Sequence, residues 1–254
     1  MHTNSRHRRP VSPGRQPSLL GTYPLPVLHL ASTPIPPDPG LPSQWQPAPP
    51  PLQYGIDYTF TQRVGRQPVR WQTGSSITVR IAGTNSRDER TALAKVVAEL
   101  RALTQLDLVT GEPLPANADP AAVPAREIHV GYLPAHRLAA SFARCAGKAG
   151  LGGATSCADG SCYVSGFAIV NADLTEPDAT GGQALAILRH QLGHALGLGH
   201  STRRGLLMHY QIATDTTQYG RGDRYGLTLL GQVPPSGITL SSDYPRIRTL
   251  PCAV

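Results

Sequence analysis

Three histidines, His190, His194 and His200, are spaced along the chain as ligands of one metal ion. Residues four apart on an α-helix share a face, so His190 and His194 can both direct a ring nitrogen at one ion. Gly197 can adopt a positive φ, end the helix and turn the chain back, which brings His200 to the same ion. Three histidine ligands leave a fourth position for water, whose pKa zinc lowers to about 7. The spacing therefore predicts one catalytic-type Zn²⁺ site.

The run from His190 to His200 resembles the H-E-x-x-H-x-x-G-x-x-H signature of the metzincin metallopeptidases. Met208, the only internal methionine, stands where the matrixin branch has its Met-turn, and the likeness is to the short bacterial type. The resemblance implies an α+β metzincin domain with a twisted mixed sheet, an active-site helix, a Met-turn and a C-terminal helix. It also implies peptide or protein substrates, held in extended form by backbone hydrogen bonds to an edge strand.

One residue departs from the signature, because Gln191 stands at the position of the family's glutamate. That glutamate takes a proton from the water and later delivers one to the leaving amine, so it must cycle between two protonation states. An amide cannot cycle, although its oxygen still accepts a hydrogen bond from water. Acid–base catalysis is worth about 10²- to 10⁴-fold in rate, so we expect weak or absent hydrolysis with metal binding retained.

Gln191 leaves three hypotheses open. The chain is a natural pseudopeptidase that binds peptide without cutting it, an engineered inactive trap of an active protease, or an active enzyme whose base comes from elsewhere. Substitute bases would be Asp173, Glu176 and Asp178 in the loop before the zinc helix. Acids at a helix N-terminus are explained as simply by the helix dipole.

Tyr210 follows Met208 by two residues, an arrangement similar to that of the astacin branch of metzincins. In that branch the phenol can approach the metal. The resemblance implies that Tyr210 is a fifth ligand or donates a hydrogen bond to the developing oxyanion. A tyrosine that only packs beside the turn is the alternative.

The composition predicts one folded domain with extensions at both ends. The chain has 254 residues, 40% of them hydrophobic. Residues 1–52 hold 14 of the 25 prolines and four arginines against one acid, which predicts a disordered basic leader. Residues 53–232 are expected to form the metallopeptidase domain and residues 233–254 a tail. The apolar patch at 18–31 is too short and too broken by proline for a membrane span or a good signal peptide.

The net charge and the cysteines limit which partners and which cellular location are expected. The net charge of +7 comes with no nucleic-acid-binding motif, so we expect no nucleic-acid partner. Cys157 and Cys162 flank an Asp-Gly turn and can form a disulfide across a hairpin if the protein is exported. The four cysteines and the family resemblance favour an extracellular location, and the lack of a convincing signal peptide keeps the cytoplasm open. The oligomeric state cannot be inferred from the sequence.

Hydrophobic periodicity places the expected elements in the order of the metzincin fold. Ser86 and Glu89 form a capping-box pattern at the start of a helix with one apolar stripe. The expected elements are a strand at 77–82, this helix to about 104, strands at 106–109 and 127–132, a hairpin with arms at 152–155 and 163–170, the zinc helix at about 180–196 and a closing helix at 222–230.

Overall fold

The computed structural model describes residues 49–72, 74, 76–83, 86–115, 117–137, 148–175 and 179–232, and the backbone of residues 252–253. Most of the expected leader (1–52) and most of the expected tail (233–254) lie outside these residues, so the domain limits stay predictions. The apolar patch at 18–31 and the acids Glu176 and Asp178 also lie outside them.

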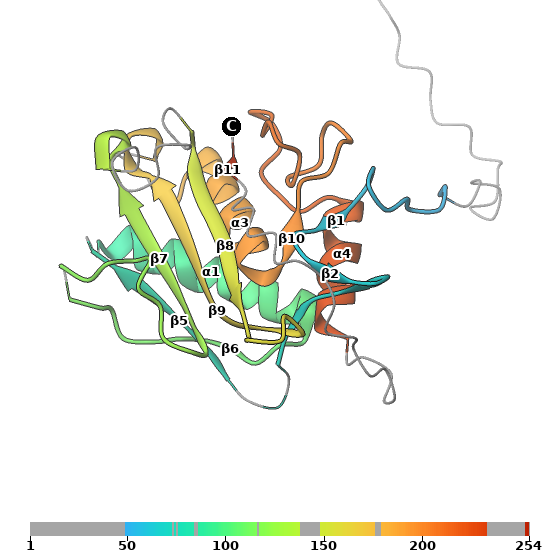
Figure 1. Cartoon of the computed structure of the whole chain (residues 1–254). Helices are drawn as coiled ribbons and strands as arrows, with labels where there is room; N and C mark the ends of the chain where they lie inside the picture. Colours follow the sequence, from blue (N-terminus) through green and yellow to red (C-terminus); the bar gives the residue numbers. More distant parts are fainter. Residues whose placement is uncertain are drawn as a thin grey trace, which may run out of the picture. The chain divides into compact units, whose positions relative to one another are not determined.

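One mixed β-sheet forms the framework of the domain. Its strands are β4 (Arg70–Trp71), β5 (Ile77–Ala82), β6 (Leu108–Thr110), β7 (Glu127–Leu133), β8 (Gly150–Ser156), β9 (Cys162–Asn171) and β11 (Cys252–Ala253). They follow the order β11-β8-β9-β7-β5-β6, and β4 pairs with β9 beside this path (Figure 1). The pairs β4–β9, β5–β6, β5–β7 and β7–β9 are parallel, whereas β8 is antiparallel to β9 and β11 is antiparallel to β8. The α+β prediction is confirmed.

Among the described residues, three α-helices accompany the sheet: α1 (Arg87–Thr104), α3 (Gly182–Leu196) and α4 (Arg221–Gly231). A short 3₁₀ helix, η3 (Ala172–Leu174), follows β9. The capping box at the start of α1 is confirmed, since the Glu89 N–H donates to Ser86 Oγ and the Ser86 N–H donates to the Glu89 carboxylate. No helix among the described residues has the length and apolarity that a bilayer span requires.

The main core lies between the sheet and helices α1 and α3. Alternate residues of β7 face it, as the period of a strand requires, and Ile128, Val130 and Tyr132 are buried there. The apolar stripe of α1 and the buried face of α3 complete this core. The opposite sheet face has a smaller buried cluster made by Leu133, Leu151, Phe167 and Ile169.

Two short strand pairs complete the described fold. Strand β2 (Arg63–Val64) pairs with β3 (Gln67–Pro68), and β1 (Thr59–Phe60) pairs with β10 (Leu198–Gly199). Because β10 follows α3 directly, this second pair holds the segment that leads from α3 to His200.

The observed elements match the expected ones closely, with one shift. The strand expected at 106–109 is β6 and begins at Leu108. Helix α1 ends at Gln105 in the left-handed conformation, with φ of 59°, and the Leu106 N–H donates to Thr104 Oγ1. These capping contacts hold residues 105 and 106 outside the strand.

Candidate metal centre

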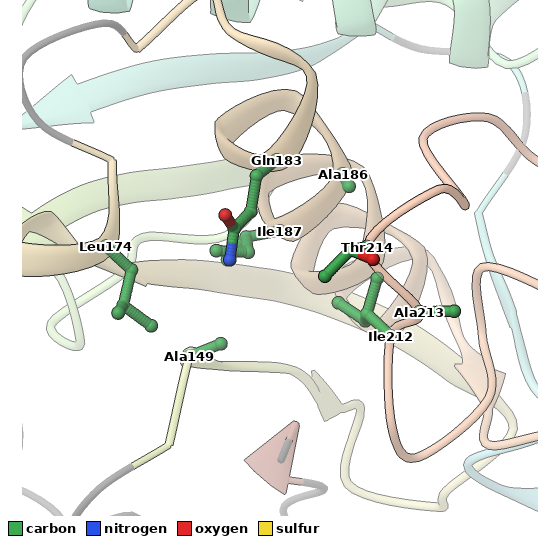
Figure 2. Close-up of a pocket in the computed structure, with 8 residues that line it drawn as sticks. All are labelled: Ala149, Leu174, Gln183, Ala186, Ile187, Ile212, Ala213 and Thr214. Atoms are coloured by element: carbon green, nitrogen blue, oxygen red, sulfur yellow. The ribbon is translucent and has the colours of Figure 1, made fainter. Parts of the chain in front are cut away.

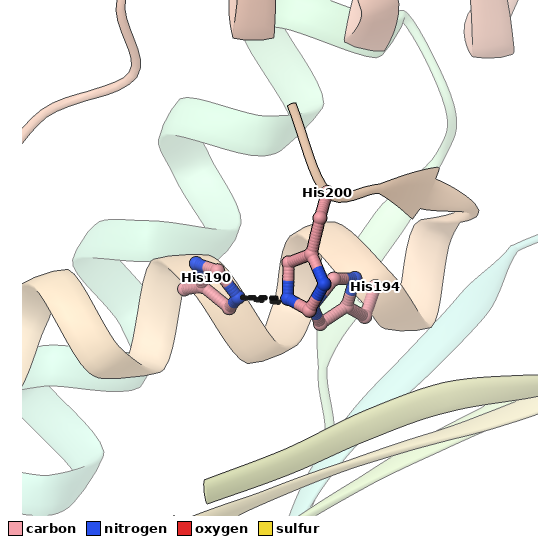
Figure 3. Close-up of side chains that lie close together, drawn as sticks. All are labelled: His190, His194 and His200. Carbon is pink, nitrogen blue, oxygen red and sulfur yellow. Dashed lines mark hydrogen bonds between the residues drawn. The ribbon is translucent and has the colours of Figure 1, made fainter. Parts of the chain in front are cut away.

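The three histidines of the motif lie together at one point on α3 (Figure 3). His190 and His194 face the same side of the helix, and His200 approaches from the segment after β10. The Nε2 atoms of His190 and His194 are 2.9 Å apart, and each lies 3.2 Å from His200 Nε2. A tetrahedral zinc ion bonded to nitrogen at about 2.0–2.1 Å separates its ligand atoms by about 3.3 Å. The cluster is therefore close to the dimensions of a zinc site.

Backbone carbonyls fix the tautomers of the two helical histidines. His190 Nδ1 donates to the Leu207 carbonyl and His194 Nδ1 donates to the Leu198 carbonyl, both at 2.7 Å. The two Nε2 atoms then present lone pairs to each other, an arrangement that a bound cation satisfies. Carbonyl partners of this kind orient histidine ligands in metal sites.

Burial keeps the three rings neutral, which is the form that binds metal. Desolvation, together with the nearby rings, lowers the pKa of His190 to about 3 and that of His200 to about 4, and lowers that of His194 well below 6.5. His190 and His194 are fully buried, whereas His200 is partly exposed. The cluster is thus reached from the side of His200.

Gly197 and strand β1 determine where His200 lies. Gly197 ends α3 with φ of 115°, and its N–H donates to the carbonyls of Gly193 and His194. Thr59 Oγ1 of β1 then donates to the His200 carbonyl at 2.8 Å. A side chain at Gly199 would collide with the Thr59 hydroxyl, so the pairing of β1 with β10 needs glycine there.

Met208 lies in a turn packed against α3 beside the histidines. A Cβ at Gly193 would lie 2.7 Å from Met208 Sδ, so the glycine between the two helical histidines makes room for the methionine. The Ser201 N–H donates to the Met208 carbonyl, which ties this turn to the residue after His200.

Asp223 of α4 stabilises the same turn by hydrogen bonds, a role that the sequence analysis missed. Its carboxylate accepts hydrogen bonds from the backbone N–H groups of Leu207, Met208 and Gly220. Burial raises the pKa of Asp223 to about 6 against the opposing effect of these donors. The Leu207 carbonyl orients His190, so the chain of support runs from Asp223 through the turn to a histidine. An acid in the first turn of a helix is too common to have signalled this.

Comparisons with known proteins agree with this geometry. Residues 117–230 match the family model of the matrixins, and this segment contains all three histidines and Met208. This segment is therefore similar to the matrixins, a branch of the metzincins. The family implies zinc and peptide or protein substrates, and the three histidines can hold a metal ion.

A solved structure also resembles this chain, and no curated protein sequence matches it. The structure is High choriolytic enzyme 1, a hatching-enzyme zinc protease from Oryzias latipes (medaka fish). The sequences are 13% identical, the alignment covers 63% of this chain and 93% of that chain, and the TM-score is 0.36. A likeness at this level adds no argument about function.

Gln191 lies on α3, on the side of the helix that packs against β8. The residue is fully buried, and neither atom of its amide has a hydrogen-bond partner among the described residues. A Cβ at Gly150 would lie 3.0 Å from Gln191 Nε2, and one at Gly152 would collide with the Gln191 carbonyl oxygen. The glycines of β8 therefore let the strand approach the helix at this residue.

A pocket lies against α3 (Figure 2). Ile187 and Gln183 line it from the helix, one and two turns before His190, and Ile212 faces them from the segment after Met208. Its volume is about 160 Å³. The remaining lining residues are Ala149, Leu174, Ala186, Ala213 and Thr214. The pocket joins four segments distant in sequence, so the sequence analysis did not find it.

The other expected site residues among the described ones, Tyr210 and Asp173, have contacts outside the histidine cluster. Tyr210 is exposed, its ring stacks on His209 at 4.2 Å between centroids, and no described hydrogen bond links its phenol to the three histidines. Asp173 accepts from the Ala135 N–H. The roles expected for these two residues stay predictions.

Cys157 and Cys162 face each other at the mouth of the β8–β9 hairpin, but both are free thiols. The Cys157 N–H donates to the Cys162 carbonyl, and burial raises the pKa of the Cys162 thiol to about 11. The disulfide allowed by the sequence is not formed in this structure. Its formation under oxidising conditions stays a prediction.

Proposed function

We propose that the domain is a zinc metalloendopeptidase scaffold that binds extended peptide and hydrolyses it weakly or not at all. A single zinc ion would be held by His190, His194 and His200, with Met208 as the Met-turn residue. The convergence of three neutral Nε2 atoms within 3.2 Å of one another is the observation that carries the proposal. The bound zinc would polarise the scissile carbonyl and lower the pKa of water to about 7.

The chain's own residues supply the binding of substrate. Strand β8 lies between β9 and the two-residue strand β11 and is next to α3. Beyond Gly150 and Leu151, which pair with β11, its outer edge offers backbone donors and acceptors to an extended peptide. The pocket beside Ile187 is of the size of an engineered cavity of about 150 Å³ that holds benzene. We assign it one aliphatic or aromatic side chain of the substrate.

Gln191 limits the chemistry. Its amide can orient water through the side-chain oxygen, but it cannot accept a proton and pass it to the leaving amine. The acid Asp173 is engaged with the Ala135 N–H and offers no evident replacement. We infer that this domain binds peptide but hydrolyses it weakly or not at all.

The test is the substitution Gln191→Glu in zinc-loaded protein. We expect kcat/KM on a proteome-derived peptide library, read by mass spectrometry, to rise about 10²- to 10⁴-fold, because the glutamate restores acid–base catalysis. Zinc content should stay at one ion per chain in both forms. Gln218→Glu makes the same chemical change at an exposed position and should leave both quantities unchanged.

Two other outcomes have distinct meanings. Equal cutting by both forms would show that another group acts as the base, and the limit assigned to Gln191 would be wrong. No cutting by either form, with zinc bound and peptide retained, would favour the second candidate, a non-catalytic peptide-binding module. The partnerless amide of Gln191 is the observation that favours this candidate, since nothing in the described site couples it to proton transfer.

A further inference from the structure

The C-terminal strand β11 occupies part of the outer edge of β8. The two strands are antiparallel, with Cys252 opposite Leu151 and Ala253 opposite Gly150. Figure 1 shows β11 beside β8, next to the end of the chain. Strand β8 has β9 on its other side, so β11 takes the edge that would otherwise be available to a partner strand.

This pairing falls on the part of β8 that lies against Gln191 and next to the pocket. Gly150, opposite Ala253, is the residue that lies against the Gln191 amide. The preceding residue, Ala149, lines the pocket on α3. The C-terminal strand thus runs toward the pocket and covers the edge between it and the middle of β8.

We propose that the last residues of the chain act as an intramolecular occupant of the peptide-binding edge, which a substrate must displace. This inference rests on the proposed function, because it takes the outer edge of β8 as the place where peptide binds. A row of backbone donors and acceptors pairs with only one strand at a time, so the two occupants exclude each other. Tethering gives the chain's own segment a high effective concentration without a strong sequence preference.

The backbone, not the cysteine side chain, is the part of the segment that this mechanism requires. Consecutive residues of a strand direct their N–H groups to opposite sides, so one of Cys252 and Ala253 can donate to β8. Proline at both positions removes that donor whichever residue supplies it. Serine at residue 252 keeps the donor and changes only the thiol.

The experiment measures binding of a fluorescent peptide with the sequence of residues 249–254 to zinc-loaded protein. Four forms are compared: the full chain, a chain ending at Pro251, the double variant Cys252→Pro with Ala253→Pro, and Cys252→Ser. We expect the shortened and double-proline chains to bind the probe about tenfold more tightly. In both chains the edge of β8 loses backbone hydrogen bonds to residues 252 and 253 and becomes free for the probe. Cys252→Ser should bind like the full chain. The proposal would be overturned by equal affinity of the full and shortened chains, or by Cys252→Ser behaving like the shortened chain.

A second readout separates this proposal from the proposed function. In the Gln191→Glu background, the shortened chain should cut library peptides with a lower KM than the full chain and an unchanged kcat. If both chains cut with the same KM, the edge is active but the self-docking is wrong. If neither chain binds or cuts any peptide, the proposed function itself has failed and the proposal falls with it.

Discussion

The two flanks of helix α3 differ in how well the polar side chains on them are supported by hydrogen bonds. On the histidine flank, two rings have fixed tautomers, and a glycine, a methionine and a buried aspartate support the turn beneath them. On the other flank, Gln191 lies fully buried under the glycines of β8 with no partner for its amide. The same helix thus has two well-supported candidate metal ligands on one flank and an unpartnered amide on the other.

We infer from this difference that metal binding by the histidines does not depend on residue 191. The ligand set depends on Nδ1 contacts with carbonyls and on Gly197, and none of these contacts involves residue 191. An amide in place of an acid at residue 191 therefore need not disturb the positions of the histidines.

The largest effect should come from removing a ligand. We expect His194→Ala to lose stoichiometric zinc, with affinity falling by more than about 100-fold, because changes to outer-shell partners of ligands alone cost 10–100-fold. Zinc content after gel filtration and competition with a chromogenic chelator measure this. His136→Ala, at an exposed position, is the control and should retain zinc. Full zinc retention by His194→Ala would show that the ion is held elsewhere.

Asp223→Asn tests the support beneath the histidines. The amide keeps the shape but turns one acceptor into a donor that faces backbone N–H groups, so we expect a loss of about 2 kcal/mol in the free energy of unfolding. Zinc affinity should fall by roughly tenfold, since the Leu207 carbonyl orients His190. Denaturant unfolding and zinc competition measure the two effects. Asp215→Asn changes an exposed acid of the same segment and should do neither. A stability loss with unchanged zinc affinity would uncouple the turn from the metal site.

The sequence predicted what local periodicity controls. Four-residue spacing placed His190 and His194 on one face, and Gly197 predicted the turn that brings His200 to them. The capping box predicted the start of α1, and alternation predicted β5 and β7. Each of these signals involves residues within a few positions of each other, so local backbone stereochemistry is sufficient to predict the structure there.

The missed features all join distant segments. Asp223 meets Leu207 across a turn, the pocket combines α3 with residues around 149, 174 and 213, and β11 meets β8 from the end of the chain. The burial of Gln191 depends on how closely Gly150 approaches α3, which only the packed sheet determines. No periodic pattern in the sequence encodes such contacts.

The smallest effect is the pH dependence of the zinc-free protein, which isolates the histidine flank because Gln191 does not titrate. The pKa of His190 is lowered to about 3 and that of His200 to about 4, while unfolded histidine titrates near 6.5. The unfolded chain therefore binds more protons between about pH 4 and 6.5, and the free energy of unfolding falls as the pH decreases through this window. Asp223 acts in the opposite direction, because its pKa of about 6 exceeds the unfolded value of 3.8, so the folded state binds more protons between these values.

Three histidines outweigh one aspartate, so the zinc-free protein should lose roughly 3–6 °C in Tm between pH 7 and pH 6. Differential scanning calorimetry in the presence of a chelator measures this loss. His194→Ala removes one of the titrating rings and should make the loss smaller. A Tm that stays constant or rises on acidification would mean that the rings are already solvated without metal. The histidine flank would then be assembled by the ion, and the contrast between the two flanks would exist only in the zinc-bound protein.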